Sequence, residues 1–416
     1  MTASTTRRAF LRTASAGTTA LAMAAVSYGR VVGANDRISI GVIGCGGRGR
    51  HAHMPGVQKH SKTQNCEIVA VADPWRQRRE EAAQQCKLWY GRAARAFVSY
   101  RDILAADDVD AVMIASCDHQ HTTHLEATAK AGKDVYCEKP LAMKLDRLKR
   151  AVDAVKKSGV VCQIGTQIRS LPTSTACRAL FQSGMFGKVA RIEQVRNGSK
   201  PYWYSRLQPV QEKDVDWNEF LMDAPRQPFR ADKFTAWYGY RDFTSGPVPG
   251  LASHFIDLIH YITGAEFPTS VTGQEGTFTW IDEHKFTCPD QVQSTWIYPE
   301  GFMVSYSTNF GNGSGSYIRF LGDRGVLNLT PWTSPTYSRA GAGRTTTLPK
   351  EETPVKPIDT PDHFLNWLQC IRSREACRAP IDAGYQHAVA VIMAVRAADT
   401  GRRQIYDPAA REIREG

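Results

Sequence analysis

The sequence predicts an α/β protein with two domains, and three observations carry this prediction. Up to about residue 167, apolar segments typical of strands alternate with amphipathic segments typical of helices, which predicts a doubly wound parallel sheet. The first apolar segment leads into glycines spaced G-x-G-x-x-G. From about residue 168 the pattern changes to period-two alternation, which predicts an α+β domain with a large, open, mainly antiparallel sheet. We therefore expect domains over 35–167 and 168–416.

The first 34 residues have the features of an export signal. Arg7 and Arg8 precede Phe-Leu, a run of small and mildly apolar residues follows, and no acidic residue occurs before Asp36. A charged start, a short apolar centre and small residues near a cleavage point after Ala34 are typical of signal peptides. The apolar run is too short for a membrane span, which needs about 20 apolar residues. Because Arg-Arg-x-Phe-Leu resembles a twin-arginine signal, we expect export to the periplasm and no membrane span in the mature chain.

Composition indicates a globular protein with a substantial core, since 42% of residues are hydrophobic and 22% are charged. The net charge of +11 falls to +7 once the four arginines of residues 1–34 are left out. The remaining basic residues alternate with acidic ones, so we expect no nucleic-acid partner. The 10 cysteines contain no C-x-x-C pair, which argues against a zinc ribbon or a thioredoxin-type site. Cys370 and Cys377 could pair in an oxidising compartment.

The glycine-rich segment predicts a dinucleotide site of the Rossmann type. Gly44 permits a tight turn, Gly46 lets a pyrophosphate approach the backbone, and Gly49 allows close packing of the following helix. That helix start offers free N–H groups to the phosphates. A second buried strand ends at Asp73, where an acid can bind the adenosine ribose hydroxyls, so NAD is favoured over NADP. The arginines that follow keep NADP possible: Arg76, Arg78 and Arg79.

The alternation of strands and helices continues to residue 167. Strand-like segments over 108–116, 134–140 and 160–166 are separated by helix-like segments over 121–132 and 144–159. Ligands of such sheets bind at the carboxyl ends of the strands. The loops expected to form the site are therefore 44–49, 73–76, 116–121 and 137–140.

Several motifs together resemble the Gfo/Idh/MocA oxidoreductases, which include glucose–fructose oxidoreductase and inositol dehydrogenase. In the first half these are GVIGCGGRG, VAVADP, CDHQH and AGKDVYCEKPLA. In the second half they are DWNEFLMDAPRQPF, SHFIDLIHYITG, SYIRFLGDRGVLNL and the last helix, GYQHAVAVIMAVRAADTGRR. The resemblance runs from about residue 37 to the end. It implies a Rossmann domain followed by an open-sheet domain whose final helix can pack back on the first domain.

The resemblance also implies the catalytic residues Lys139 and His254. Lys139, in Glu-Lys-Pro, would lie beside the nicotinamide, where an ammonium can stabilise a developing alkoxide. His254 would accept the hydroxyl proton, as histidine can near neutral pH. In the family pattern D-x-x-x-H-x-x-D the first acid falls on Gly250, a departure that removes a carboxylate from the site. The expected cofactor-binding residues are Gly44, Gly46, Gly47, Arg48, Gly49, Asp73, Ser116, His121, Glu138 and Lys139.

Two other groups of residues were considered for the site. The segment DHQHTTH at 118–124 has the composition of a metal site, but the resemblance makes it a loop that contacts the nicotinamide ribose and caps the next helix, so we expect no metal. Aromatic residues of the second half, including Trp203 and Tyr238, could stack on a sugar ring or simply pack the sheet. The candidate substrate residues are Arg169, Trp237, Tyr240, Arg241 and Asp257.

The expected function is an exported NAD(P)-dependent oxidoreductase that acts on a hydroxyl of a sugar, polyol or glycoside. Outside the cytoplasm no free NAD pool can be relied on, so the cofactor should be held tightly and recycled within the site. One alternative is a redox-neutral, NAD-assisted glycosidase or lyase. Another is a non-catalytic binding protein that retains the cofactor. We also expect a homo-oligomer, because an exposed sheet face is usually covered.

Overall fold

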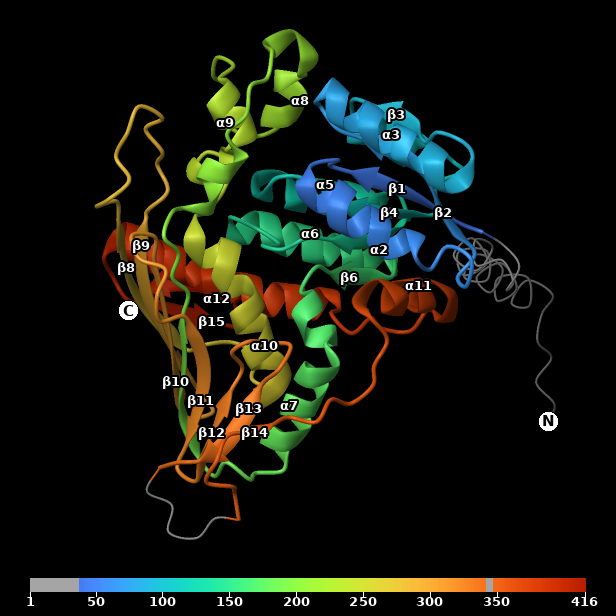
Figure 1. Ribbon diagram of the computed structural model, residues 1–416. Coiled ribbons are helices and arrows are strands. Elements are labelled where there is room, and N and C mark those ends of the chain that lie inside the picture. The colour runs from blue at the N-terminus through green and yellow to red at the C-terminus, as the bar shows by residue number, and fades with distance from the viewer. Residues whose placement is uncertain (1–36, 342–346) are drawn as a thin grey trace, which may run out of the picture.

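The computed structural model describes residues 37–341 and 347–416 and contains two sheets with helices packed between and around them (Figure 1). The expected signal over 1–34 lies outside the described residues. Within those residues no helix combines the length and the apolar character needed to cross a membrane.

The first sheet has six strands in the order β3-β2-β1-β4-β5-β6, and every pair is parallel. Its strands β1, β2 and β4 are buried along their whole length, because helices cover both faces of the sheet. This confirms the predicted doubly wound sheet. The strands are β1 Ile38–Ile43, β2 Cys66–Ala72, β3 Arg95–Phe97, β4 Ala111–Ile114, β5 Asp134–Cys137 and β6 Cys162–Ile164. The helices are α2 Met54–Gln58, α3 Arg76–Tyr90, α4 Tyr100–Ala105, α5 His121–Lys130 and α6 Leu145–Ser158.

The second sheet has ten strands in the order β14-β13-β12-β11-β7-β10-β9-β8-β15-β16. Only β7 and β10 pair in parallel, so the predicted mainly antiparallel sheet is confirmed. Buried and exposed residues alternate along β9 and β10, because one face of the sheet packs on helices. The strands are β7 Val189–Val195, β8 Ser270–Gly276, β9 Gln291–Tyr298, β10 Phe302–Asn309, β11 Tyr317–Gly322, β12 Gly325–Asn328, β13 Thr336–Arg339, β14 Thr353–Pro354, β15 Gln404–Asp407 and β16 Glu412–Glu415.

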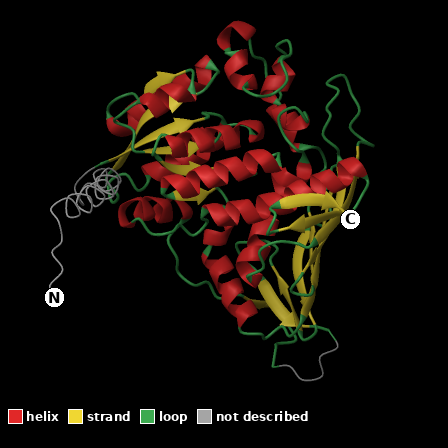
Figure 2. Ribbon diagram, turned by 180° about the vertical axis from the view of Figure 1, so that it is seen from behind, coloured by secondary structure: helices red, strands yellow, loops and turns green. Residues whose placement is uncertain are grey.

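A layer of helices lies between the two sheets (Figure 2). It contains α7 (Pro172–Gln182), α10 (Ser253–Thr263) and the long α12 (Ile381–Thr400). Helix α12 contacts α10 and β8 of the second domain and also α6 and β6 of the first. Its inward side is made of small and branched apolar residues that are fully buried, such as Ala388 and Val391. The last long helix therefore packs against both domains.

Helix α11 (His363–Ser373) returns to the first domain, which the sequence did not indicate. It packs on α2, and Trp367 belongs to the same core cluster as Met54 of that helix. The ring of Phe364 stacks on Tyr136 of β5 with centroids 5.2 Å apart. Part of the core of the first domain is thus supplied from near the end of the chain.

Short helices and turns between β7 and α10 extend over the carboxyl ends of the first sheet (Figure 1). Trp75, directly after β2, forms an isolated bridge with Val215 of this region. An aromatic cluster that includes Trp75, Phe220, Phe234 and Phe243 holds the two parts together. The elements are η4 Tyr202–Arg206, η5 Glu212–Asp214, α8 Trp217–Leu221, α9 Ala231–Thr235, η6 Trp237–Gly239 and η7 Val248–Ala252.

Candidate active site

A cavity of about 600 Å³ lies at the carboxyl ends of β1, β2, β4 and β5. One side, which we call the sheet wall, is formed by the loops that follow these four strands. The opposite side, the second-domain wall, is formed by Tyr202, Arg206, Trp237, Tyr238, Gly250, Leu251 and His254. The sheet wall contains nine of the ten predicted cofactor residues: Gly44, Gly46, Gly47, Arg48, Asp73, Ser116, His121, Glu138 and Lys139.

The glycine loop after β1 has the shape that a dinucleotide requires. Gly44 adopts φ +90°, and a Cβ there would lie 2.6 Å from the carbonyl carbon of Ala115. Gly49, the tenth predicted residue, lies behind the cavity, and a Cβ there would collide with the carbonyl oxygen of Gly44. The chain then enters a π-helical turn, η1 (Gly49–His53), and continues as α2. Gly46 and Gly47 carry no side chain, so a pyrophosphate can approach their backbone. The side-chain atoms nearest to where a Cβ would lie belong to the guanidinium groups of Arg78 (3.2 Å, at Gly46) and Arg206 (3.6 Å, at Gly47).

Asp73 lies at the end of β2, where the ribose of a dinucleotide would be bound. Its carboxylate accepts hydrogen bonds from the backbone N–H of Cys45 (2.7 Å) and of Trp75 (2.8 Å). Burial raises the pKa of this carboxyl, and the nearby Arg78 opposes that shift. A carboxylate oxygen can accept more than one hydrogen bond, so Asp73 can still receive a ribose hydroxyl.

Of the three arginines that follow Asp73, Arg78 is the one that lines the cavity. Its guanidinium lies 4.6 Å from the ring centre of Trp75. Arg76 instead pairs with Asp214, and Arg79 donates to the carbonyl oxygen of Asp73 at 3.2 Å. Arg78 is therefore the side chain that could meet a 2′-phosphate.

Glu138 is the centre of a buried charge network directly after β5. Its Oε1 atom accepts a hydrogen bond from Arg48 Nε at 2.6 Å and lies 2.8 Å from His53 Nε2. Burial alone would raise the pKa of Glu138, but Arg48 and His53 outweigh it and hold the pKa far below its usual value. The carboxylate is thus ionised and fixed in place beside Lys139.

Lys139 crosses from the sheet wall to the second-domain wall. Its Nζ atom donates a hydrogen bond to the carbonyl oxygen of Gly250 at 2.7 Å. Burial lowers the pKa of the ammonium, while the negative charges of Glu138 and Asp118 oppose the change. The pKa of Lys139 is thus lowered overall, with two neighbouring carboxylates acting against the shift.

His254 lies one helical turn beyond Gly250 and lines the same cavity as Lys139. Burial is the main cause that lowers its pKa well below the usual value, and the Lys139 ammonium lowers it further. The imidazole is therefore neutral at pH 7. Its Nδ1 atom is buried and has no hydrogen-bond partner within the described residues. The structure thus brings together the two predicted catalytic residues from opposite walls.

The predicted substrate residues divide into two groups. Trp237 lines the cavity, and its ring stacks on Tyr238 with centroids 3.6 Å apart. The other four do not line the cavity, because their polar groups are used elsewhere. Arg169 and Asp257 form a buried ion pair with each other, at 2.7 Å and 3.0 Å.

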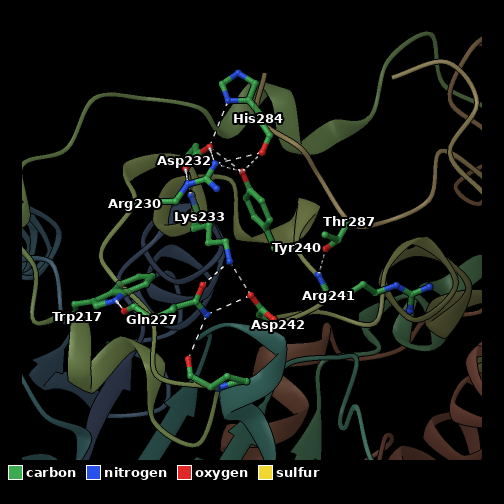
Figure 3. Close-up of polar contacts among 11 residues, drawn as sticks. Trp217, Gln227, Arg230, Asp232, Lys233, Tyr240, Arg241, Asp242, His284 and Thr287 are labelled. Atoms are coloured by element: carbon green, nitrogen blue, oxygen red, sulfur yellow. Dashed lines mark hydrogen bonds and ion pairs between the residues drawn. The ribbon is translucent and has the colours of Figure 1, made fainter. Parts of the chain in front are cut away.

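Figure 3 shows why Tyr240 is not available to a ligand of this cavity, and the side chain of Arg241 is also used elsewhere. The Tyr240 hydroxyl donates to Asp232 at 2.8 Å, and Arg230 holds the same carboxylate. Arg241 pairs with Glu275 and donates to the carbonyl oxygen of Ser245 at 2.9 Å. Both residues stabilise the loops behind the second-domain wall, so we do not assign them to the substrate.

The histidine-rich segment 118–124 does not cap α5 as expected. Gln120 is the side chain that caps the preceding turn, accepting from the backbone N–H of Cys117 at 3.2 Å. His119 bonds the carbonyl oxygen of Phe220, and His124 bonds Ser116. Across residues 37–341 and 347–416, no three His, Cys, Asp or Glu side chains are grouped so that they could hold a metal ion.

Two cavity residues, Tyr202 and Arg206, were not predicted. Both lie on η4, where the sequence singled out the neighbouring Trp203. Trp203 is instead buried in an aromatic cluster with Phe310. The run of aromatic residues indicated the region, but a short 3₁₀ helix has no hydrophobic repeat that tells which ring faces a ligand.

Comparison with known proteins agrees with this geometry. Residues 38–166 match the NAD-binding Rossmann fold of the Gfo/Idh/MocA oxidoreductase family, and residues 220–405 match its C-terminal alpha/beta domain. Inositol 2-dehydrogenase from Rubrobacter xylanophilus is 33% identical over 156 residues, which is 37% of this chain and 42% of that one. The matches to two uncharacterized oxidoreductases, from Bacillus subtilis and Rhizobium meliloti, span 42% and 46% of the length of those proteins.

Two solved structures share the whole fold. Aldose-aldose oxidoreductase from Caulobacter crescentus, complexed with glycerol, has a TM-score of 0.67 at 20% identity and covers 88% of this chain and 99% of that chain. The WlbA dehydrogenase from Bordetella pertussis, in complex with NADH and UDP-GlcNAcA, has a TM-score of 0.64 at 22% identity and covers 88% and 98%. Because the two matching family models together cover most of the chain, the protein belongs to the Gfo/Idh/MocA family of oxidoreductases.

Proposed function

We propose that the protein is an NAD-dependent oxidoreductase that acts on a hydroxyl group of a sugar, polyol or glycoside. The observation that carries the proposal is the meeting of Lys139 and His254 in one cavity beside the glycine loop. The residues present fit a dinucleotide, since Gly44 and Gly46 leave the loop open and Asp73 lies at the end of β2. The names of the relatives, which refer to inositol and aldoses, support a polyhydroxylated substrate.

The residues of the chain can perform the proton transfer that such a reaction needs. When bound, the nicotinamide supplies the hydride acceptor. Lys139 can move its hydrogen bond from the Gly250 carbonyl to the substrate oxygen and stabilise negative charge there. The imidazole of His254 is neutral and its Nδ1 atom is unpaired within the described residues, so it can take the proton of the same hydroxyl. Glu138 stays ionised and holds Lys139 in place.

A substrate panel tests this function. The full-length protein, loaded with NAD or NADP, is mixed with glucose, myo-inositol, levoglucosan and aryl glycosides, and both the nicotinamide absorbance and the products are followed. We expect one or more members to be oxidised with a matching change in cofactor. Cleavage of a glycoside without net change in cofactor would favour the redox-neutral alternative. Retained cofactor with no reaction would favour a binding protein.

We also propose that the protein is exported with its cofactor already bound. Support comes from the arginine pair of residues 7 and 8, which the twin-arginine pathway would recognise. Replacing both arginines by lysine should leave unprocessed protein inside the cell, and denatured wild-type protein should release a dinucleotide. Normal appearance of the double variant outside the cytoplasm would contradict this route.

We further propose a homo-oligomer that covers the outer face of the second sheet. On that face Ile297 of β9 is 39% exposed and Met303 of β10 is 37% exposed, and the two are paired neighbours. Light scattering on a Met303→Lys variant would test this, because a charge at a covered apolar face should dissociate the oligomer. A wild-type protein that is monomeric at micromolar concentration would refute it.

A further inference from the structure

Tyr202 lies on η4 in the second domain, and none of the sequence motifs places it in the site. Its hydroxyl oxygen is buried in the cavity and has no hydrogen-bond partner within the described residues. A buried polar group without a partner destabilises the folded state, so such groups usually bind a ligand or a water molecule. The unpaired hydroxyl therefore points to a polar ligand atom next to it.

The ring of Tyr202 is held rigidly. It makes edge-to-face contacts with Trp203, Tyr238 and Phe310, with centroids 5.3 Å, 5.4 Å and 5.8 Å away. A phenol fixed on three sides loses little freedom when it binds a ligand, which is what a preorganised binding group needs.

The hydroxyl occupies the space in front of Gly250. A Cβ at residue 250 would lie only 2.7 Å from the Tyr202 oxygen, and the ring carbon behind that oxygen would be 3.8 Å away. The carbonyl oxygen of the same glycine accepts the hydrogen bond of Lys139 Nζ at 2.7 Å. Tyr202 and Lys139 therefore meet at one residue, and its lack of a side chain makes room for the hydroxyl.

We infer that the Tyr202 hydroxyl binds a hydroxyl oxygen of the substrate beside Lys139, and so is a third catalytic residue. The assignment rests on the proposed oxidation of a polyhydroxylated substrate and adds to it the group that orients this substrate from the second-domain wall. Burial raises the pKa of the phenol, and the charge of Asp118 raises it further, so Tyr202 stays protonated and donates a hydrogen bond. Proton acceptance is left to His254.

The test compares Tyr202→Phe with wild type and with Tyr204→Phe. Tyr204 lies on the same 3₁₀ helix, but its hydroxyl bonds Asp282 at 2.5 Å and it does not line the cavity. We expect Tyr202→Phe to keep its bound dinucleotide and to lower kcat/KM about 10- to 100-fold on the panel member that wild type oxidises. Its melting temperature should stay equal or rise, because a buried unpaired hydroxyl is removed. Tyr204→Phe should keep the wild-type kcat/KM.

The outcomes separate this inference from the proposed function. If wild type transfers hydride and Tyr202→Phe does so with unchanged kcat and KM, the role of Tyr202 is wrong while the proposed function stands. A loss of activity that accompanies a lower melting temperature and lost dinucleotide would mark a structural role and also overturn the assignment. If wild type oxidises no member of the panel, the proposed function fails and this assignment fails with it.

A double-mutant cycle of Tyr202 and Gly250 tests the contact between them without any substrate. Gly250→Ala alone should lower the melting temperature, because its Cβ meets the Tyr202 oxygen. In the background of Tyr202→Phe the same change should cost clearly less, since the nearest ring atom is 3.8 Å away. Equal losses in both backgrounds would contradict the contact on which the inference depends.

Discussion

The two walls of the cavity differ in how their polar groups are satisfied. On the sheet wall, Glu138 bonds Arg48 and His53, and Asp73 accepts two backbone hydrogen bonds. On the second-domain wall, the Tyr202 oxygen and His254 Nδ1 are buried without a partner within the described residues. The carboxylates of the first wall thus have their partners before any ligand arrives, whereas the second wall has polar groups free for a ligand. A family can in this way keep one cofactor and change substrates by changing the second wall.

The largest expected effect is on kcat, in variants that remove Lys139 from the sheet wall or His254 from the second-domain wall. Lys139→Ala and His254→Ala should each reduce kcat about 10²- to 10⁴-fold while NAD stays bound, because both act on one substrate hydroxyl. The double variant should lose much less than the product of the two, since residues that act together fail together. Steady-state kinetics and dinucleotide content measure this. Lys130→Ala, at an exposed surface pair with Glu126, serves as the control. Full activity in both single variants would refute the assignment of the site.

The second prediction concerns pH. The free energy of unfolding should fall as the pH drops below 7. Burial is the main cause that lowers the pKa of seven histidines, and for three of them, His119, His363 and His387, it falls to about 4. The unfolded chain takes up these protons near pH 6.5 and the folded chain does not, so stability is present above pH 6.5 and falls as the pH drops. From pH 7 to 5.5 the loss should be about 1 kcal/mol for each of the three.

Three carboxyls oppose this trend. Burial raises the pKa of Asp118 to about 6 and also raises the pKa of Asp73 and of Asp134, so the folded protein binds protons there more readily than the unfolded chain does. Three such groups against seven histidines leave the net sign unchanged. Urea unfolding between pH 5.5 and 7 would measure the slope, and His119→Gln should reduce it by up to one proton. Stability that is constant or rises toward pH 5.5 would be inconsistent with neutral buried histidines.

The third prediction tests the interactions of Glu138 with Arg48 and His53 on the sheet wall. Glu138→Gln removes the charge that Arg48 and His53 share, and should lower the free energy of unfolding by about 1–3 kcal/mol. It should also weaken dinucleotide retention, because Arg48 lines the cavity. Glu67→Gln is the matched control: its partners Arg37 and Arg92 are 45% and 55% exposed, and such pairs contribute less than about 1 kcal/mol. Equal losses in the two variants would remove the contrast between them.

The smallest effect is expected at the ribose end of the sheet wall. Arg78→Ala should reduce affinity for NADP about three- to tenfold and change affinity for NAD less, because the half-buried guanidinium can contact a 2′-phosphate, and a solvent-accessible charge pair contributes about 1 kcal/mol or less. Arg76→Ala should change neither, since Arg76 pairs with Asp214. Titration of dinucleotide-free protein with both cofactors would measure this. A loss of NAD affinity equal to that of NADP would show that Arg78 does not discriminate between them.

The difference between the sheet wall and the second-domain wall also explains which site residues the sequence could predict. Asp73, Glu138 and Lys139 could be placed because each directly follows a buried parallel strand, and such strands end at one edge of the sheet. Arg169 and Asp257 are predicted substrate residues, but in the structure they form an ion pair with each other. Nothing in a sequence shows that two charges 88 positions apart will neutralise each other.

Tyr202 illustrates the other limit. Within YWYSR, three neighbouring aromatic rings have different surroundings: Tyr202 faces the cavity, Trp203 is buried, and Tyr204 bonds Asp282. No periodic pattern distinguishes them. The open second sheet was predictable from its period-two strands, whereas the return of α11 to the first domain depends on contacts between residues as far apart as Gln163 and His363, which are 200 positions apart.

That return of α11 has a consequence for how the chain is made. Trp367 and Leu368 complete the core around Met54 and Val57, and Phe364 covers Tyr136 of β5. A growing chain that has already produced the glycine loop still lacks this cover until residues 363–373 leave the ribosome. At roughly 5–20 residues per second, the nucleotide domain stays unfinished for about ten seconds or longer after its own last strand is synthesised. Truncated products should therefore expose a partly open apolar core to chaperones and proteases, and dinucleotide capture becomes a late step that only nearly full-length chains can complete.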